Sequence, residues 1–526
     1  MYNGILWEAK GGKSLKNNYN FGYVKYNLKR GFIHHVCALA FEIHFPCQSL
    51  ILFKAKLRRK QIKMKKTFKF YTAMFLAKCA NKSLKLLRRN ASYFPGNLAL
   101  KICPNFLEQI DKPPVIIGVT GTNGKTTVSN MINDVLEDNG YKVINNRYGS
   151  NMNTGIAASF VNNNTITGKN TKDIAVFEMD ERSTIHIFKY ITPTYLVCNN
   201  LSRDSLKRNA HTAFIAGIIN NAIPKATTVI TNGDDPICVN LASENKKIYF
   251  GIDRLDTDTE KCENIVQDMV LCPKCGTKLE YEYYRYHHVG KMKCPNCGFG
   301  TPKRDYETTK IDFENKLVTI KDNDKNTEYS YSMVADGIIN IYNMLSAIVA
   351  LKQVGVSDEK INEALKKTKI VDTRFSQDEV AGKKIVLHLA KGQNPIACSR
   401  VFDYVRKQPE KKTIILFLDD LHEDNETITW FYDTDYEFLN GDNVEQIIVS
   451  GKRSKDTIVR LLMAGVPKEK IFADRDEVES VRKYFKPKDI ESVYVLYDLY
   501  AMKQKEEVHQ EVKKILESTF GNEVEE

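Results

Sequence analysis

A lysine and a threonine hydroxyl follow a glycine-rich turn in residues 115–127, which read Val-Ile-Ile-Gly-Val-Thr-Gly-Thr-Asn-Gly-Lys-Thr-Thr. Gly121 and Gly124 let the backbone approach an anion closely. Lys125 can reach the β- and γ-phosphates of a nucleotide, and the hydroxyl of Thr126 can ligate Mg²⁺. The segment therefore predicts a phosphate-binding loop, although Val119 stands where the GxxxxGK[ST] pattern has its first glycine.

Such a loop needs a strand before it and a helix after it. The apolar run from Val115 predicts a buried parallel strand, and a helical pattern extends from Val128 to Asn139. The free amides and the dipole of that helix would favour a phosphate at its start. The plainer interpretation, a glycine-rich turn with a solvated lysine, requires neither element.

A second acidic position follows another apolar run, Ile174 to Glu178. Ligands in open parallel sheets bind at the carboxyl ends of the strands. Glu178 is therefore the predicted ligand of a nucleotide-bound Mg²⁺. For Asp180 and Glu181, a role at the site and a place as solvated loop acids are both open.

The chain between Val115 and Phe250 alternates short apolar runs with helical stretches such as Ala213–Ala222. This alternation predicts a doubly wound α/β domain with a mostly parallel sheet. Besides the run before the loop, the strand candidates are Lys142–Asn146, Ile174–Glu178, Tyr195–Cys198 and Thr228–Thr231.

Four cysteines form a pair of Cys-x₂-Cys motifs, each followed by glycine and separated by 18 residues. This spacing predicts one tetrahedral Zn²⁺ held by four thiolates. A closed shell of four sulfurs leaves no position for a reacting water, so the site should be structural. The predicted ligands are Cys272, Cys275, Cys294 and Cys297.

The tract between the two motifs, residues 280–288, is aromatic and basic. It could form the two strands of a ribbon hairpin, or it could stack on nucleic-acid bases. His287 and His288 are predicted at the surface, because four sulfurs already complete the metal shell. The ribbon interrupts the α/β pattern and is predicted to be an insertion in the central domain.

Two further strands, Lys316–Lys321 and Thr327–Ser332, precede a helix that opens at Asp336 and runs to Val354. Asn340 and Asn343 lie near its start and could face a nucleotide or cap the helix. A second α/β unit follows from about Val371. Its predicted strands are Lys384–Leu389, Thr413–Leu418, Gln446–Val449, Lys470–Phe472 and Ser492–Leu496.

The 526 residues suggest about three domains. We predict a central ATP-binding domain over 113–369, with the ribbon at about 268–304, and a Rossmann-like C-terminal domain over 370–526. Residues 1–63 are interpreted as an upstream extension of the reading frame, because they fit neither a signal peptide nor a membrane span. Scattered cysteines outside the two motifs fit a reducing cytosol. The net charge of +12 is compatible with an anionic substrate, an anionic membrane surface or nucleic acid, and it does not distinguish among them.

Residues 64–112 form a basic helical lead-in. The pattern from Met64 to Phe94 predicts one amphipathic helix among lysines and arginines. It could pack on the next domain with its basic face in solvent, or rest on an anionic lipid surface. The apolar residues assigned to its face are Phe68, Tyr71, Phe75, Leu76 and Leu87.

Together these motifs resemble a known family. The loop Thr120–Thr127 resembles that of the Mur ligases and folylpolyglutamate synthases, which explains Val119. The Cys₄ ribbon inside the central domain, together with four further segments, resembles the MurT family, the ligase subunits of lipid II isoglutaminyl synthases. The resemblance runs from about Met64 to the end of the chain. The segments are Tyr148–Gly155, Phe177–Glu181, Thr231–Pro236 and Thr429–Asp433.

The resemblance implies ATP-dependent amidation of the α-carboxyl of D-isoglutamate in the lipid II stem peptide, through an acyl phosphate. Ammonia would come from a GatD-like glutaminase that forms a heterodimer with the chain. The complex would act at the cytoplasmic face of the bacterial membrane, and contact with the membrane surface is left open. No nucleic-acid partner is expected. The implied cofactors are ATP, Mg²⁺ and structural Zn²⁺. Lys125 and Glu178 would be catalytic, with Thr126 and Glu178 on Mg²⁺. The implied nucleotide-binding residues are Gly121, Thr122, Asn123, Gly124, Lys125, Thr126, Thr127, Asn343 and Arg374.

The chain departs from this family at three places. Thr427 stands where the family usually has an Asp that completes the glutaminase triad, and Asp424 and Glu426 do not match that position. The segment Leu389–Pro395 carries two extra residues, and Asn209-Ala210 replaces a usual Gly-Glu. A ligase that joins another amine to a carboxylate, and a P-loop ATPase whose ribbon binds nucleic acid, therefore remain alternatives.

Overall fold

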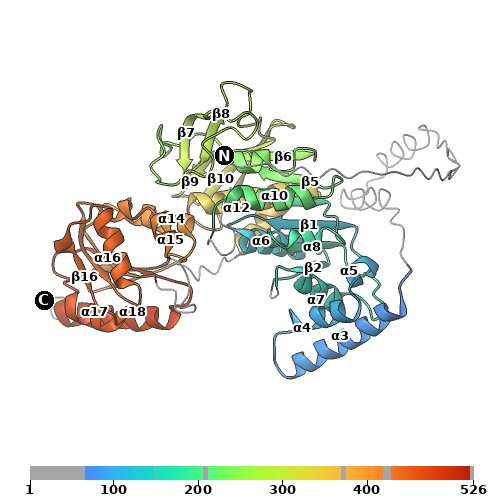
Figure 1. Cartoon of the computed structure of the whole chain (residues 1–526), viewed down its shortest axis with the longest axis horizontal. Coiled ribbons are helices and arrows are strands. Elements are labelled where there is room, and N and C mark those ends of the chain that lie inside the picture. Colours follow the sequence, from blue (N-terminus) through green and yellow to red (C-terminus); the bar gives the residue numbers. More distant parts are fainter. Residues whose placement is uncertain (1–64, 148–149, 205–210, 369–374, 419–427, 522–526) are drawn as a thin grey trace, which may run out of the picture. The chain divides into compact units, whose positions relative to one another are not determined.

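The computed structural model describes residues 65–147, 150–204, 211–368, 375–418 and 428–521, all within one compact unit that spans 51–526. Nine of the described strands form one sheet in the order β11-β10-β9-β6-β5-β4-β1-β3-β2 (Figure 1). These strands are β1 (Val115–Thr120), β2 (Val143–Asn145), β3 (Ile174–Glu178), β4 (Tyr195–Cys198), β5 (Thr228–Asn232), β6 (Lys247–Ile252), β9 (Tyr306–Asp312), β10 (Leu317–Asp322) and β11 (Thr327–Ser332).

The order of this sheet places the phosphate-loop strand in its parallel part. β1 lies between β3 and β4 and pairs with both in parallel, so that the carboxyl ends of the three strands share one edge. Its six residues are all buried, as expected of a strand covered on both faces. The doubly wound α/β architecture is thus confirmed, and β9, β10 and β11 extend the sheet with antiparallel pairs.

Helices cover both faces of this sheet. One apolar core joins α6 and α12, which pack on each other, with α13. The other face is covered by α7, α8, α10 and α11 together with the N-terminal helices. The helices are α6 (Lys125–Asp138), α7 (Asn153–Asn163), α8 (Thr184–Ile187), α10 (Thr212–Ala222), α11 (Pro236–Asn240), α12 (Ile338–Gln353) and α13 (Asp358–Lys367).

The cysteine-rich segment forms a hairpin of its own. β7 (Glu280–Tyr286) and β8 (Val289–Lys293) pair antiparallel in a separate two-stranded sheet. The hairpin is inserted between β6 and β9, which are neighbours in the large sheet. The alternating pattern of the tract therefore reflects a ribbon hairpin, as the first of the two interpretations predicts.

A second sheet has the order β12-β13-β17-β14-β15-β16 and is parallel except for its edge strand β12. Helices flank it and cover two further apolar cores. Its strands are β12 (Phe375–Val380), β13 (Lys383–Leu389), β14 (Lys412–Phe417), β15 (Val444–Val449), β16 (Ile471–Ala473) and β17 (Ser492–Tyr497). Its helices are α14 (Pro395–Arg406), α15 (Thr429–Tyr432), α16 (Ser454–Met463), α17 (Glu477–Tyr484) and α18 (Met502–Phe520), with 3₁₀ turns η1 (Tyr436–Leu439) and η2 (Lys468–Lys470).

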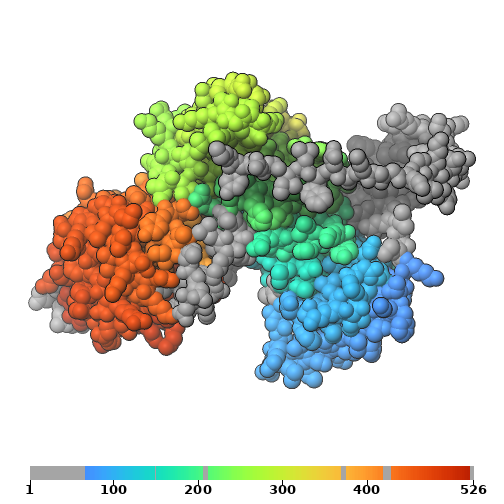
Figure 2. Space-filling view, in the orientation of Figure 1, coloured from blue at the N-terminus to red at the C-terminus, as the bar shows by residue number. Residues whose placement is uncertain are grey.

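The N-terminal lead-in is not one helix. α3 (Phe68–Leu86) ends eight residues before the predicted limit, and α4 (Phe94–Ile102) and α5 (Phe106–Gln109) follow. Under the interpretation that the helix packs on the next domain, the predicted apolar face is wrong, because all five residues assigned to it are exposed. The buried face of α3 consists of Phe70, Ala73, Met74 and Ala77. No helix of the described part combines the length and apolarity needed to cross a bilayer. Figure 2 shows the surface of the same molecule, with these helices in blue.

Candidate functional site

The strand, loop and helix that bind phosphate are formed as the sequence predicts. β1 ends at Thr120, and α6 begins at Lys125. Gly121 and Gly124 have φ angles of 128° and 86°, a region that side chains strongly disfavour. The loop therefore turns sharply enough to direct the first amides of α6 towards its concave side.

A short segment after β4 holds the loop in place. The Thr122 amide donates to the Asn200 carbonyl at 2.9 Å, and the Asn123 amide donates to the Asn200 side-chain oxygen at 2.9 Å. The Thr122 hydroxyl donates to the Ser202 carbonyl and accepts from the Ser202 amide, both at 3.0 Å. One residue earlier, the Leu201 amide donates to the Asp235 carboxylate at 3.0 Å. These polar partners were not predicted, since they follow a strand without any motif.

Lys125 has a carboxylate partner that the sequence left open. Its ammonium lies 2.8 Å from the Glu181 carboxylate and donates to the Gly121 carbonyl at 2.6 Å. Glu181 is 1% exposed, so it is not a solvated loop acid. Burial raises the pKa of Glu181, against the opposing effect of Lys125. Asp180 instead caps the following turn by accepting from the Arg182 amide at 3.1 Å.

Thr126 and Glu178, the two predicted magnesium ligands, lie together. The Thr126 hydroxyl donates to one Glu178 oxygen at 2.8 Å, and the Asn151 side chain donates to the other at 3.3 Å. Asn146 fixes the end of β3, because its side chain exchanges two 2.9 Å hydrogen bonds with the Glu178 backbone. A hydroxyl and a carboxylate at this edge form a hard-oxygen donor set that fits Mg²⁺.

Asn343 of α12 closes the loop from the other side. Its side-chain oxygen accepts from the Asn199 side chain at 2.5 Å. The same oxygen would lie 2.0 Å from a β-carbon added to Gly124, so only glycine fits there. Asn340 instead donates to the Asp336 carbonyl of its own helix start. A nucleotide contact by Asn343 stays a prediction, as do the other site roles.

The extra residues before α14 form a strained turn that reaches the phosphate loop. Lys391 and Gln393 have φ angles of 48° and 65°, a conformation that few non-glycine residues adopt. Asn394 then caps α14 and donates to the Asp204 carboxylate at 3.1 Å. Its amide nitrogen also lies 3.5 Å from the side-chain oxygen of Asn123. Asn394 thus brings a residue of the C-terminal part to the phosphate loop.

Arg203 joins three parts of the chain. Its guanidinium binds Asp268, before the ribbon, at 2.6 Å and Asp433, in the C-terminal part, at 3.0 Å. Several residues named with the resemblance lie outside the described residues, namely Arg374, Thr427, Asp424, Glu426, Asn209 and Ala210. Their roles are not tested by the geometry.

The four cysteines of the ribbon converge on one point. Their sulfurs all lie within 4.8 Å of one another, with Cys272 and Cys297 at 3.5 Å and Cys275 and Cys294 at 3.4 Å. Sulfurs about 2.3 Å from a tetrahedral Zn²⁺ are about 3.8 Å apart, so the cluster fits that ion. The glycines after each motif have φ angles above 70°, which allows the two tight turns.

Buried charges attach the ribbon to the large sheet. Arg285 of β7 binds Asp234 at 3.1 Å and Asp258 at 2.7 Å. Arg304 binds the other oxygen of Asp234 at 2.7 Å, and its guanidinium donates to the Tyr283 hydroxyl at 3.2 Å. Because Tyr283 and Arg285 are buried and paired, they are not available to stack on bases.

His287 and His288 are buried, so the prediction that they lie at the surface is wrong. The His287 ring nitrogen Nδ1 lies 3.1 Å from the Val266 carbonyl, and burial lowers the pKa of His287 to about 3. His288 lies 3.4 Å from Asp235, and this carboxylate raises the pKa of His288 against the effect of burial. The hairpin turn faces the sheet because the ribbon is docked on it, which spacing alone did not reveal.

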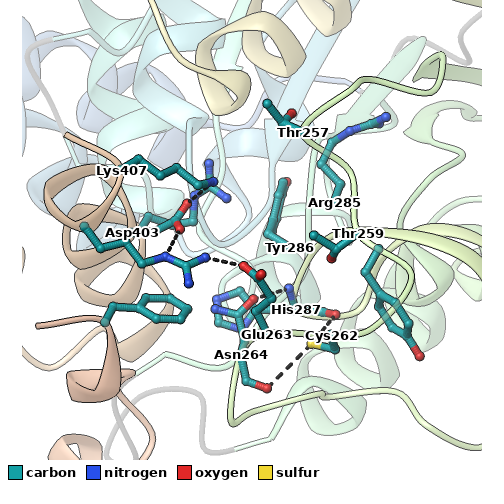
Figure 3. A pocket seen from close by; sticks show the side chains of 14 residues that line it. Thr257, Thr259, Cys262, Glu263, Asn264, Arg285, Tyr286, His287, Asp403 and Lys407 are labelled. Carbon is teal, nitrogen blue, oxygen red and sulfur yellow. Dashed lines mark hydrogen bonds and ion pairs between the residues drawn. The ribbon is translucent and has the colours of Figure 1, made fainter. Parts of the chain in front are cut away.

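A small pocket lies between the entry to the ribbon and α14 (Figure 3). Arg406 pairs with Glu263 and with Asp403, and Lys407 also binds Asp403, at 2.9 Å. Arg400 lies over the Tyr286 ring at 4.5 Å from its centroid. Most charged side chains around the pocket form ion pairs with one another, which is typical of a packed contact between two elements.

A parallel sheet with a P-loop at the carboxyl end of β1, followed by a second α/β sheet, is the architecture expected of Mur-type ligases. The Mur ligase middle domain family matches residues 119–271, and the MurT ligase C-terminal family matches residues 391–502. The chain belongs to the MurT family of Mur ligases, and is therefore an ATP-dependent ligase of peptidoglycan biosynthesis.

Two relatives support this membership over most of their length. The subunit MurT of lipid II isoglutaminyl synthase (glutamine-hydrolyzing) from Staphylococcus aureus is 30% identical over 419 residues, covering 78% of this chain and 92% of the relative. The corresponding Streptococcus pneumoniae subunit is 30% identical over 416 residues, covering 78% and 90%.

Solved structures show the same fold. A pseudomurein peptide ligase type C from Methanothermus fervidus aligns with a TM-score of 0.55 at 20% identity, over 79% of this chain and 84% of that one. A MurF ligase from Thermotoga maritima in complex with ADP gives 0.51 at 18% identity, over 81% and 85%.

Proposed function

We propose that this chain is the ligase subunit of an enzyme that amidates the α-carboxyl of D-isoglutamate in the lipid II stem peptide. The observation that carries the proposal is the 30% identity over 92% of a relative named as a subunit of glutamine-hydrolyzing lipid II isoglutaminyl synthase. The P-loop with Glu178 and the Cys₄ ribbon, present in one chain, are consistent with it.

The proposed reaction has two steps. The substrate carboxylate attacks the γ-phosphorus of ATP, ADP leaves, and an acyl phosphate forms. Ammonia then attacks the acyl carbon, phosphate leaves with the electron pair of the C–O bond, and the ammonium intermediate loses a proton to give the amide. The first step is needed because a free carboxylate is a poor electrophile, and phosphorylation gives it a leaving group.

The P-loop residues would stabilise the charge that moves in the first step. The α6 amides and Lys125 would bind the β- and γ-phosphates. Mg²⁺, when bound, neutralises phosphate charge, and Thr126 and Glu178 would hold it. Because Lys125 now binds the buried Glu181, phosphate binding would exchange one anionic partner for another. Burial of Glu181 favours its protonated form, which eases this exchange.

The relatives are named as subunits, so a partner is expected, and we propose a GatD-like glutaminase that supplies ammonia. The segment that would carry its contact, with Thr427 in place of Asp, is outside the described residues. Whether the chain can take its amine from another source is tested by leaving the glutaminase out of the reaction.

The test is amidation of lipid II by the full chain with ATP and Mg²⁺, with the product identified from the mass of the stem peptide. Free ammonia is expected to support the reaction, and glutamine should replace it only when a glutaminase partner is added. No product with ammonia would contradict the proposal. Product with ammonia, but none with glutamine and the partner, would place the defect in the coupling of the subunits.

A further inference from the structure

The outward face of α3 carries a band of apolar side chains. Phe68, Tyr71, Phe75 and Leu86 recur at helical spacing, and the first and last are 87% and 85% exposed. The opposite face is the buried one described above, and it packs towards α4 and α7. The exposed band is therefore separate from the surface that attaches the helix to the domain.

The band continues past the end of the helix. Leu87 is 67% exposed, and Tyr93 and Phe94 at the start of α4 are also exposed. Single exposed apolar residues are ordinary on proteins, but contiguous ones mark an interaction surface. Large apolar side chains on 68–94 that face solvent are Phe68, Tyr71, Phe75, Leu76, Leu86, Leu87, Tyr93 and Phe94.

The same segment is positively charged throughout. Residues 65–107 contain no Asp or Glu but nine basic residues: Lys65, Lys66, Lys69, Lys78, Lys82, Lys85, Arg88, Arg89 and Lys101. Lys66 pairs with Asp111 at 3.2 Å. Lys69, Lys82, Lys85 and Arg89 are exposed and have no ion-pair partner within the part of the chain that the structure describes. Burial and the charge of Lys85 lower the pKa of Lys78, in keeping with this crowding of cations.

We propose that residues 65–94, with α3 at their centre, form a docking surface for a lipid bilayer that bears anionic headgroups. An amphipathic helix binds such a surface by placing its aromatic and aliphatic side chains at the headgroup boundary while flanking lysines meet the negative charge. Lys78 and Lys85 border the apolar band of α3 on one side and Lys69 on the other, while Lys82 lies within the band, seven residues after Phe75 and four before Leu86. The helix lies parallel to the membrane plane in this arrangement.

The composition of the band favours a bilayer over a nucleic acid. Aromatic rings could stack on bases, but Leu76, Leu86 and Leu87 have no π-face to offer. Aliphatic side chains do gain from leaving water at a bilayer surface. The inference stands on α3 and its surroundings and does not depend on the proposed amidation.

The test is flotation of the full chain with vesicles that contain no substrate. Vesicles of phosphatidylcholine alone are compared with vesicles that also contain phosphatidylglycerol. We expect binding to the anionic vesicles that weakens as salt is raised, because surface charges are screened over about 10 Å at 0.1 M salt. Equal binding to both vesicle types would overturn the proposal.

Two variants separate the charged and apolar contributions. Replacing Lys69, Lys82, Lys85 and Arg89 by Gln should weaken binding at least about a hundredfold, since each basic residue near an anionic surface contributes about fivefold. Replacing Phe68, Phe75 and Leu86 by Ser should weaken it about tenfold or more. All these positions are exposed, so circular dichroism melting should match the parent.

Matched controls remove the same groups elsewhere. Lys455, Lys468, Lys488 and Lys514 are exposed in the C-terminal part, and their replacement by Gln removes the same net charge. Phe214, Phe313 and Leu462 are exposed and far from α3 in sequence, and they are replaced by Ser. Both controls should bind vesicles like the parent. If the α3 variants and the controls bind alike, or if the chain binds RNA but not vesicles, the proposal is overturned.

Discussion

The phosphate loop and the Cys₄ ribbon arrange their charges differently. In the loop, Lys125 and Thr126 bind Glu181 and Glu178, partners that incoming phosphate and Mg²⁺ would replace. In the ribbon, four sulfurs face one another, and Arg285 lies between two buried carboxylates. A catalytic site needs charged side chains whose partners the substrate can replace. A structural site keeps each of its charged side chains paired with the same partner.

Removing the metal should have the largest effect, because the apolar cluster of the ribbon is small and includes two of the four cysteines, Cys272 and Cys294. A structural Zn²⁺ contributes about 10 to 16 kcal/mol in zinc-finger peptides. We expect about one zinc per chain after dialysis, and we expect Cys294→Ser to lose it and to expose the ribbon to protease. Cys262→Ser, outside the cluster, is the control for metal analysis and proteolysis. A fully active, zinc-free chain would contradict the assignment.

Lys125→Ala should remove ATP turnover while the fold survives. Loss of a charge that stabilises a transferring phosphoryl group lowers kcat about a thousandfold or more. The fold survives because Glu181, whose pKa is already raised by burial, can take up a proton when its partner is removed. Lys142→Ala, an exposed lysine on the same domain, is the control in an ADP-release assay. Turnover that persists in Lys125→Ala would refute the role.

Arg285→Met should destabilise the domain with little direct effect on nucleotide binding. It leaves Asp258 buried without its cation, while Asp234 keeps Arg304, and an unpaired buried charge costs about 3 to 5 kcal/mol. Lys291→Met on the same hairpin removes only a surface pair with Glu282 and should cost less than about 1 kcal/mol. Urea unfolding of both variants measures the difference. Equal urea midpoints for the two variants would show that the buried ion pairs of Arg285 contribute no more stability than the surface pair of Lys291.

The smallest effect is a dependence of stability on pH through His287. Its pKa is lowered to about 3 in the folded chain, while an unfolded histidine titrates near its ordinary value of 6.5. The stability from the neutral ring is therefore present above pH 6.5 and is lost as the pH falls towards 3. Between pH 7.5 and 5 the loss is about 2 kcal/mol.

His287→Asn tests this dependence without straining the backbone. The φ angle of His287 is 46°, and asparagine tolerates that region well. The variant should lose about 2 kcal/mol less than the parent between the two pH values in urea unfolding. An unchanged pH profile would assign the acid sensitivity to other groups.

Much of the fold could be predicted because buried parallel strands are short, apolar and separated by helices. β3, β4 and β11 have the predicted bounds, and most other strands differ by one or two residues. β6, β9 and β12 were not predicted, since their polar or mixed patterns do not alternate clearly. The doubly wound α/β class follows from the pattern, but the domain boundaries at 113, 370 and around the ribbon remain predictions.

The site was predictable where a residue acts through a local motif. The Cys₄ cluster and the P-loop depend on spacing within a few residues, and both assemble as expected. Glu181, Asn200 and Asn394 act across 56 to 271 residues of sequence, and a single sequence carries no signal of such contacts. The packing interpretation assigned the face of α3 wrongly because it took the exposed aromatic and leucine side chains to point inward, whereas the buried side consists of Phe70, Ala73, Met74 and Ala77.

Asp235 gives the insertion a further consequence. One of its oxygens faces His288 at the tip of the hairpin, and the other holds Leu201, beside the residue that fixes Thr122 in the loop. The ribbon therefore contacts the segment that holds the phosphate loop through the carboxylate of Asp235. In a cell short of zinc, we expect the ligase activity of this chain to fall as the supply of zinc falls. Its contribution to peptidoglycan synthesis would then depend on the zinc available to the cell.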